Sequence, residues 1–201
     1  MLKAWATLFT PCTRPHMNEV MVDLETLDTA AGAIILSIGA VKFDLDKGVI
    51  DDEGFYASIS IDSNLAQGRT MSESTLLFWL KQPQEAQVVF HEPKIHLEDA
   101  LNQFTEWLGH AKWRMWGNGP AFDLVKVANA YQSFGWDHPW EFWNERCVRT
   151  YRSLPGAEKV PKVAPTVAHH ALHDAVAQAQ HVINIHQALF NAKVSAKAAK
   201  A

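Results

Sequence analysis

The pattern of hydrophobic residues predicts three β-strands at the start of the chain. The first strand is the apolar run over residues 18–26, which carries two acidic residues near its end. Residues 33–43 and residues 55–60 are also rich in β-branched and aromatic side chains, and a turn at 46–48 separates them. Because the links are short, we expect the three strands to pair as an antiparallel meander.

Helices and strands alternate in the middle of the chain. Residues 62–71 are polar and are predicted to form a loop, after which Ser72 begins a helix that ends before Pro83. Apolar residues at helical spacing predict a second helix over 97–108, and a buried strand follows at 113–117.

The last third of the chain continues this alternation. A glycine-containing corner over 118–123 leads into a helix that stops near Gly135, and residues 146–150 form a strand that passes into a turn. The longest helix is predicted over 169–190, with one apolar stripe: Leu172, Val176, Ala179, Ile183 and Phe190. The whole pattern is typical of an α/β fold, in which polar groups gather where strand ends meet helix starts.

Composition narrows the class of protein. The 201 residues carry a formal net charge of −4 and include 2 cysteines, which excludes a disulfide framework and a cysteine-rich zinc site. No apolar segment is long enough to span a membrane, and the net charge argues against a protein that coats nucleic acid through bulk positive charge. We expect one domain over residues 17–190, an N-terminal extension over 1–16 outside the fold, and a flexible basic tail over 191–201.

Asp23 and Glu25 are the first candidates for chemistry. Side chains two residues apart on a strand point to the same side, so these two carboxylates are expected to lie together. Such crowding favours protonation of one carboxylate unless a cation neutralises both, and the spacing therefore suits a divalent metal with oxygen ligands. The alternative is an ordinary acidic strand end that leads into a loop.

Two further acids lie near helix starts. Asp123 ends the corner that begins at Asn118, where it is either a site residue or a helix cap. Asp174 lies early in the last helix, about 130° from the centre of the apolar stripe when each residue turns roughly 100°. That position permits a solvated side chain as readily as one that faces a site.

In chain order, the motifs are Asp-x-Glu on the first strand, Asn-x-x-x-Phe-Asp at the corner and His-x-x-x-x-Asp at the last helix. This order resembles the DEDDh group of 3′-to-5′ exonucleases over about residues 18–190. The resemblance implies a ribonuclease H-like α/β fold, with a mixed sheet of three antiparallel strands followed by parallel strands, flanked by helices. It also implies a metal-binding role for four acids: Asp23, Glu25, Asp123 and Asp174.

The histidines ahead of Asp174 leave two options for a general base. The family pattern selects His169, five residues before Asp174, which fits only if His169 lies on non-helical backbone ahead of the first turn. His170 is the alternative, because a residue four positions before Asp174 would lie on the same side of the helix.

Shorter matches look like the exonuclease VIII-like proteins of phages and prophages. They cover residues 37–40, 78–82, 116–119 and 148–150. Those proteins are similar in turn to phage exonuclease A and to a mycobacterial-type exoribonuclease, and they differ in whether DNA or RNA is cut. An acidic residue is expected in close relatives where this chain has Cys147.

The resemblance implies hydrolysis at a 3′ end with two divalent ions, Mg²⁺ or Mn²⁺. One ion would lower the pKa of a water, the other would stabilise the leaving 3′ oxygen, and His169 would accept the proton from that water. Thr26 and Leu27 would lie beside the terminal nucleotide, Asn118 would contact the substrate, and Trp79 would either stack on the base or pack in the core.

The implied partner is a nucleic acid with a single-stranded 3′ end or a 3′ overhang, and no membrane. The expected location is the cytoplasm of a bacterium or of a phage-infected host, and a homodimer is one option for the assembly. Two rival functions stay open: an inactive module that binds 3′ ends or partners a phage recombination protein, and a hydrolase of free nucleotides or very short oligomers.

Overall fold

A computed structural model describes residues 17–109, 112–119 and 121–191 of the chain. The predicted extension over 1–16 and residues 192–201 of the predicted tail lie outside the described residues. None of the helices in these described ranges is long and apolar enough to cross a membrane.

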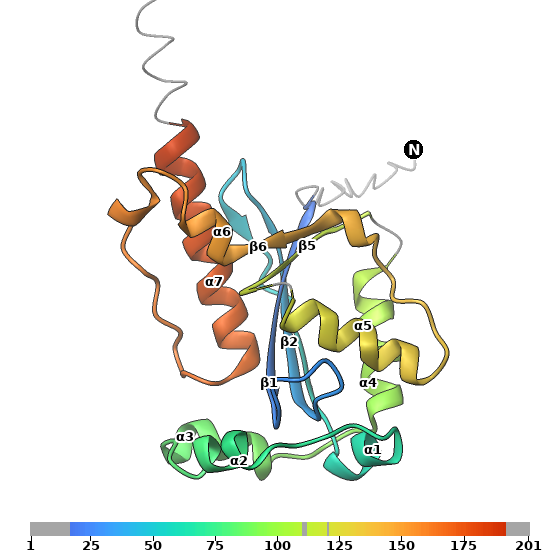
Figure 1. Cartoon of the computed structure of the whole chain (residues 1–201). Helices are drawn as coiled ribbons and strands as arrows, with labels where there is room; N and C mark the ends of the chain where they lie inside the picture. Colours follow the sequence, from blue (N-terminus) through green and yellow to red (C-terminus); the bar gives the residue numbers. More distant parts are fainter. Residues whose placement is uncertain (1–16, 110–111, 120, 192–201) are drawn as a thin grey trace, which may run out of the picture.

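A mixed β-sheet lies at the centre of the fold (Figure 1). Its strands run in the order β3-β2-β1-β5-β6, and β4 also pairs with β2. β1 is antiparallel to β2 and parallel to β5, β6 is parallel to β5, and both β3 and β4 are antiparallel to β2. The predicted sheet of antiparallel strands followed by parallel strands is therefore confirmed. The strands are β1 (Glu19–Thr26), β2 (Ile35–Asp44), β3 (Val49–Ile50), β4 (Phe55–Ser58), β5 (Arg114–Gly117) and β6 (Glu145–Cys147).

Helices cover both faces of the sheet. Figure 1 shows α4 and α5 on one face and α7 on the other, while α1, α2 and α3 lie beyond one end of β1 and β2. The α-helices are α1 (Ile61–Ala66), α2 (Glu73–Trp79), α3 (Gln84–Gln87), α4 (Leu97–Leu108), α5 (Asp123–Ser133), α6 (Val148–Arg152) and α7 (Ala171–His186). Short 3₁₀ segments are η1 (Val88–Phe90), η2 (Phe142–Asn144) and η3 (Ala157–Lys159), and η4 (Gln187–Asn191) is a π-helix.

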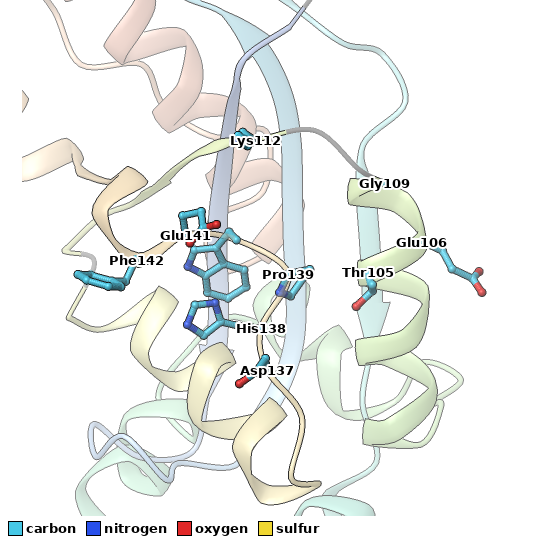
Figure 2. A pocket seen from close by; sticks show the side chains of 10 residues that line it. Thr105, Glu106, Gly109, Lys112, Asp137, His138, Pro139, Glu141 and Phe142 are labelled. Atoms are coloured by element: carbon cyan, nitrogen blue, oxygen red, sulfur yellow. The ribbon is translucent and has the colours of Figure 1, made fainter.

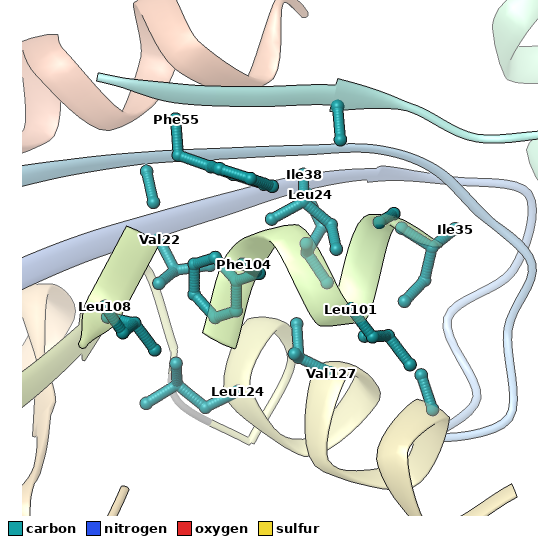
Figure 3. Close-up of a cluster of buried hydrophobic side chains, with 14 of the residues drawn as sticks. Val22, Leu24, Ile35, Ile38, Phe55, Leu101, Phe104, Leu108, Leu124 and Val127 are labelled. Carbon is teal, nitrogen blue, oxygen red and sulfur yellow. The ribbon is translucent and has the colours of Figure 1, made fainter. Parts of the chain in front are cut away.

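Alternation along β1 decides which face carries the acids. Three apolar side chains of β1 belong to the core beneath α4 and α5, which Figure 3 shows from close by: Val20, Val22 and Leu24. Met21 belongs instead to a second core beneath α6 and α7. Because successive side chains of a strand point to opposite faces, Asp23 and Glu25 share the face of Met21 and lie towards α7.

The buried face of α7 agrees with the predicted stripe at Ala179 and Ile183, which are both 0% exposed, and differs from it elsewhere. Val176 and Phe190, which the stripe included, are 38% and 43% exposed. The face against the sheet is made largely of small side chains, each of them 0% exposed: Ala171, Ala175 and Ala179. Small side chains let the helix approach closely, and a Cβ atom on Gly39 of β2 would lie only 2.1 Å from the carbonyl carbon of Ala171.

Two short helices also differ from the prediction. α1 starts one residue before the segment predicted as a polar loop and covers the first part of it. Buried Asn64 ties the helix to β2: its Nδ2 donates to the Ile35 carbonyl at 3.1 Å, and its Oδ1 accepts from the Ile35 N–H at 3.0 Å. α6 replaces the turn predicted after the last strand. Cys147 is its N-cap, and Cys147 Sγ accepts a hydrogen bond from the Thr150 N–H at 3.4 Å.

Candidate active site

A pocket of about 420 Å³ opens where β1 ends, between α2, the start of α5 and the start of α7. The side chains that concern its chemistry come from five separate parts of the chain: Asp23, Glu25, Phe78, Asn118, His169 and Asp174. Strand ends and helix starts thus converge at one place, as expected for an α/β fold.

Three of the predicted acids form a compact group. Asp23, Glu25 and Asp174 each place a carboxylate oxygen within 4.8 Å of the other two. Gln178, one turn further along α7, donates from Nε2 to Asp23 Oδ1 at 2.8 Å, and the His170 N–H donates to Asp174 Oδ2 at 3.2 Å. Within the described ranges, no lysine or arginine forms an ion pair with any of the three carboxylates.

Asp123, the fourth predicted ligand, belongs neither to this close group nor to the lining of the pocket. It is the first residue of α5 and only 2% exposed, and its Oδ2 accepts a hydrogen bond from the Asn118 N–H at 3.0 Å. Phe122, not Asp123, holds the N-cap position, so Asp123 is not the helix cap that the sequence left as an alternative. Its negative charge acts on both Asp23 and Glu25.

Burial raises the pKa values of all four carboxylates, and repulsion from neighbouring carboxylates adds to the rise for Asp23 and Glu25. Burial raises the pKa of Asp23 well above its ordinary value, and the three neighbouring carboxylates raise it further. Burial, with the charges of Asp174 and Asp123, raises the pKa of Glu25 to about 8. Burial likewise raises the pKa of Asp123 to about 7, and it raises that of Asp174. Three carboxylates this close together, with no ion pair to a lysine or arginine in the described ranges, fit a hard divalent metal, which prefers oxygen ligands.

His169 lies on non-helical backbone ahead of α7, as its spacing from Asp174 requires. Its φ is 60°, which makes it a left-handed residue, and the helix begins only at Ala171. The ring lines the pocket edge-on to Phe78, at 5.3 Å between centroids. The ring of His170 instead stacks between Tyr56 at 4.5 Å and His173 at 4.1 Å, outside the pocket lining.

The comparisons with known proteins point to one family. The sequence model of one protein family, the 3′-5′ exoribonuclease Rv2179c-like domain, matches residues 18–200. The chain belongs to this family. No curated protein matches its sequence.

One solved nuclease structure shares the fold of this exoribonuclease-like chain, and two others match it less closely. A full-length 3′-exonuclease superposes with a TM-score of 0.53 at 12% identity, over 84% of this chain and 80% of the other. A 3′-exonuclease that recognises the 3′ end of the histone mRNA stem-loop gives 0.48 at 12% identity, over 84% and 80%. Cell-death related nuclease 4 gives 0.47 at 13% identity, over 84% and 64%.

Of the residues of β1 and α2 and their ends that were predicted to contact substrate, Thr26 and Trp79 line the pocket and Leu27 does not. Thr26 lines the pocket, and its Oγ1 donates to the Asp28 carbonyl at 2.9 Å. Leu27 does not line the pocket: it is 2% exposed and packs in a small core with Trp79. Trp79 does line it but is also 2% exposed, and its Nε1 donates to the Thr26 carbonyl at 2.9 Å. The structure therefore places Leu27 in the core, and it gives Trp79 the packing role that the sequence left open.

Among the pocket residues that the sequence did not predict, two bear on the chemistry: Phe78 and Gln178. Gln178 contacts Asp23, and its Oε1 is buried without a hydrogen-bond partner among the described residues. Gln178 comes four residues after Asp174, so the two side chains lie on one side of α7. This spacing could have identified Gln178 from the sequence. Phe78 precedes Trp79 and is 42% exposed at the pocket. No signal in the sequence separated these two neighbouring aromatic residues.

A larger pocket of about 900 Å³ lies elsewhere, between α4 and the loop that precedes η2. Figure 2 shows Glu106 on α4 pointing away from Asp137 and His138, so these charged and polar groups do not converge. In the described part of the chain, the only group of acidic, histidine or cysteine side chains close enough to hold a metal is that of Asp23, Glu25 and Asp174. The chemistry therefore points to the smaller pocket.

Proposed function

We propose that the chain is a 3′-5′ exonuclease that uses two divalent ions, Mg²⁺ or Mn²⁺, and releases nucleoside 5′-monophosphates from the 3′ end of a single strand or an overhang. The observation that carries the proposal is the convergence of Asp23, Glu25 and Asp174 on one pocket, in a chain of the exoribonuclease-like family. We assign the activity to a domain over residues 17–190. The narrower resemblance to phage and prophage enzymes stays a prediction.

The four acids would hold the ions, with Asp23, Glu25 and Asp174 as the compact set and Asp123 beside them. When bound, the ions would supply an activated water and stabilise charge on the leaving 3′ oxygen. Gln178 would keep the Asp23 carboxylate in place through its hydrogen bond.

His169 is our candidate for the general base. It lines the same pocket as the acids, and its ring is held edge-on against aromatic side chains of α2. A histidine suits this role because the residue type titrates near neutral pH. The base would take the proton from the attacking water.

The terminal nucleotide would lie between Phe78 and the Asn118 corner. Phe78 presents a partly exposed ring to the pocket, which suits stacking on a base of any sequence. Asn118 Oδ1 is buried without a hydrogen-bond partner among the described residues, so it would accept a hydrogen bond from the substrate. Thr26, whose carbonyl is held by Trp79, would form the wall beside the nucleotide.

A direct test incubates matched DNA and RNA strands, single-stranded and with 3′ overhangs, with Mg²⁺, Mn²⁺ or EDTA. We expect a stepwise ladder from the 3′ end that EDTA abolishes. Asp23→Asn and Asp174→Asn should each lower kcat by roughly a thousandfold or more, because each removes a ligand charge while keeping the shape of the side chain.

Asp52→Asn is the matched control, since Asp52 is exposed and does not line the pocket. Its activity should equal that of the wild type. Normal metal-dependent hydrolysis by a folded Asp23→Asn or Asp174→Asn variant would contradict the proposal. Binding of 3′ ends by the wild type without any cleavage would favour the inactive binding module instead.

A further inference from the structure

A second groove, of about 630 Å³, adjoins the pocket. Asn118 lines both cavities, so the groove begins at the corner that closes the pocket. Its walls come from α6, η3 and the following loop, and from α7. We call this cavity the basic groove and define it by four side chains: Arg149, Arg152, Lys162 and His181.

The basic side chains of the groove are not paired with other side chains in the described part of the chain. Within the described ranges, neither Arg149, Arg152 nor Lys162 forms an ion pair or a side-chain hydrogen bond. The one carboxylate that lines the groove belongs to Glu158, and its Oε2 accepts a hydrogen bond from the Gly156 N–H at 2.8 Å. Three cations therefore face one carboxylate that is already bonded to the backbone.

His181 adds a buried polar atom to the groove. The side chain is only 6% exposed, and its Nδ1 has no hydrogen-bond partner among the described residues. Burial lowers the pKa of His181, and the charges of Arg152 and Lys162 lower it further. The Pro161 carbonyl accepts a hydrogen bond from the ring, so Nδ1 is a donor only in the protonated ring, in which both nitrogens carry a proton. An anionic ligand in the groove would favour that form and accept the hydrogen bond from Nδ1.

Arg149 links the groove to the acids. A Cβ atom on Gly119 would lie 3.6 Å from Arg149 Cζ, so the guanidinium packs against the backbone of the Asn118 corner. The positive charge of Arg149 also lowers the pKa of Asp123, against the larger effect of burial. Arg149 therefore lies beside the corner that the pocket and the basic groove share.

We propose that the basic groove binds the phosphodiester backbone of the nucleic-acid strand upstream of the bond that is cut. This inference rests on the proposed exonuclease function. A chain with a net charge of −4 and a cluster of carboxylates repels a polyanion at long range, so local unpaired cations beside the pocket are needed to hold the strand. Cations that bind phosphate leave the bases unread, which suits removal of nucleotides of any sequence.

The test compares a long single strand with a dinucleotide, which we expect to be too short to reach the basic groove from the acidic pocket. In Arg152→Gln/Lys162→Gln, we expect the KM for the long strand to rise about tenfold or more at low salt, because the variant cannot form charge-assisted hydrogen bonds to phosphate at these two positions. The ratio of kcat/KM for the long strand to kcat/KM for the dinucleotide should fall by the same factor. The slope of log KM against log salt concentration should decrease by about 1.4, since each phosphate that a cation neutralises on a single strand adds roughly 0.7 to the slope.

Lys47→Gln/Lys112→Gln is the matched control, since it removes the same charge at two exposed positions outside the linings of both cavities. Its ratio and salt slope should equal those of the wild type. Should the Arg152/Lys162 double variant fail to fold, Lys162→Glu at an exposed loop position gives the same readout.

An unchanged ratio and salt slope in a folded variant, while the wild type digests the strand, would overturn the inference and leave the exonuclease proposal standing. If the wild type digests neither substrate, the exonuclease proposal fails. Fluorescence anisotropy of the long strand in EDTA then tests the groove alone: weaker, less salt-dependent binding by the double variant would support it, and equal binding would overturn it.

Discussion

His169 combines an uncommon backbone with a position in the pocket. A non-glycine residue with a φ of 60° is uncommon, and such residues gather at functional sites, where the surroundings hold them in place. The backbone geometry at His169 turns the chain just before α7 and directs the ring towards Phe78 and the pocket, while His170 and His173 stack together elsewhere.

The base assignment predicts a rate effect at His169 alone. His169→Asn should lower kcat about a hundredfold to ten-thousandfold, because the base is removed while asparagine still tolerates the left-handed backbone. KM and the stabilisation by Mg²⁺ should change little. His170→Asn and His173→Asn are the matched controls in steady-state kinetics, and a larger loss in His170→Asn would move the role to that residue.

Phe78 and Leu77 differ in what their exposed side chains face. Phe78, 42% exposed, lines the pocket, whereas its neighbour Leu77, 46% exposed, does not. Phe78→Ala should raise KM for a single strand about fivefold to a hundredfold, since stacking on one base contributes about 1 to 3 kcal/mol. Leu77→Ala should leave KM unchanged. Equal KM values in wild type and Phe78→Ala would rule out the stacking role.

At the scale of elements, the site depends on how closely α7 approaches β2. Gly39 pairs with Asp23 across the β1–β2 ladder, and the first turn of α7 lies directly on it. A Cβ atom there would lie 2.1 Å from Ala171 C and 2.2 Å from Leu172 N, which are backbone atoms and cannot rotate away. The absence of a side chain at Gly39 thus sets the distance from Asp174 to the acids of β1.

Gly39→Ala should therefore push the start of α7 outward. We expect a loss of about 1 to 3 kcal/mol in the free energy of unfolding, as for other overpacked sites, and a loss of activity larger than the instability explains. Gly32→Ala is the control, because a Cβ there meets only Asn129 Oδ1 at 3.8 Å. Urea unfolding and kinetics would test this, and full activity in Gly39→Ala would contradict it.

At the scale of the whole molecule, the acid cluster makes stability depend on pH and on metal. The four carboxylates have higher pKa values in the folded protein than in the unfolded chain, so the folded state binds more protons. Below the pKa values of the unfolded chain, their contribution to stability is fully present, and it is lost as pH rises through the pKa values of the folded protein. For Glu25, the loss extends from its ordinary pKa of 4.5 to its folded pKa of about 8.

Without divalent metal, the contribution of the four carboxylates to Tm should fall between about pH 5 and about pH 8. Mg²⁺ should raise Tm more at the higher pH, because its carboxylate ligands must be deprotonated. Asp23→Asn relieves repulsion, so at about pH 8 without metal it should raise Tm by about 2 to 4 °C for each kcal/mol recovered, and respond less to Mg²⁺. Asp52→Asn should behave as wild type in thermal unfolding. A lower Tm for metal-free Asp23→Asn at that pH would contradict the prediction.

The sequence by itself determined the local elements and the pairing of the first two acids. Period-two alternation on β1 puts Asp23 and Glu25 on one face, and the spacing of apolar residues predicted α4 with the bounds that the structure has. These features depend on neighbours in the chain, and local periodicity encodes them directly. At His169 the two kinds of evidence differed: apolar periodicity placed the residue at the start of the last helix, whereas the family pattern required the non-helical backbone that the structure has.

Only the tertiary structure decided which face of α7 is buried, and with it the direction of Asp174. Hydrophobicity favoured Val176, but close contact with the sheet required alanines, so the helix is rotated relative to the predicted stripe. The same dependence on distant partners explains α1, which Asn64 ties to β2, and the burial of Leu27. How closely two segments far apart in the chain approach each other depends on the shapes of the side chains that pack between them. The periodicity within one segment does not contain this information.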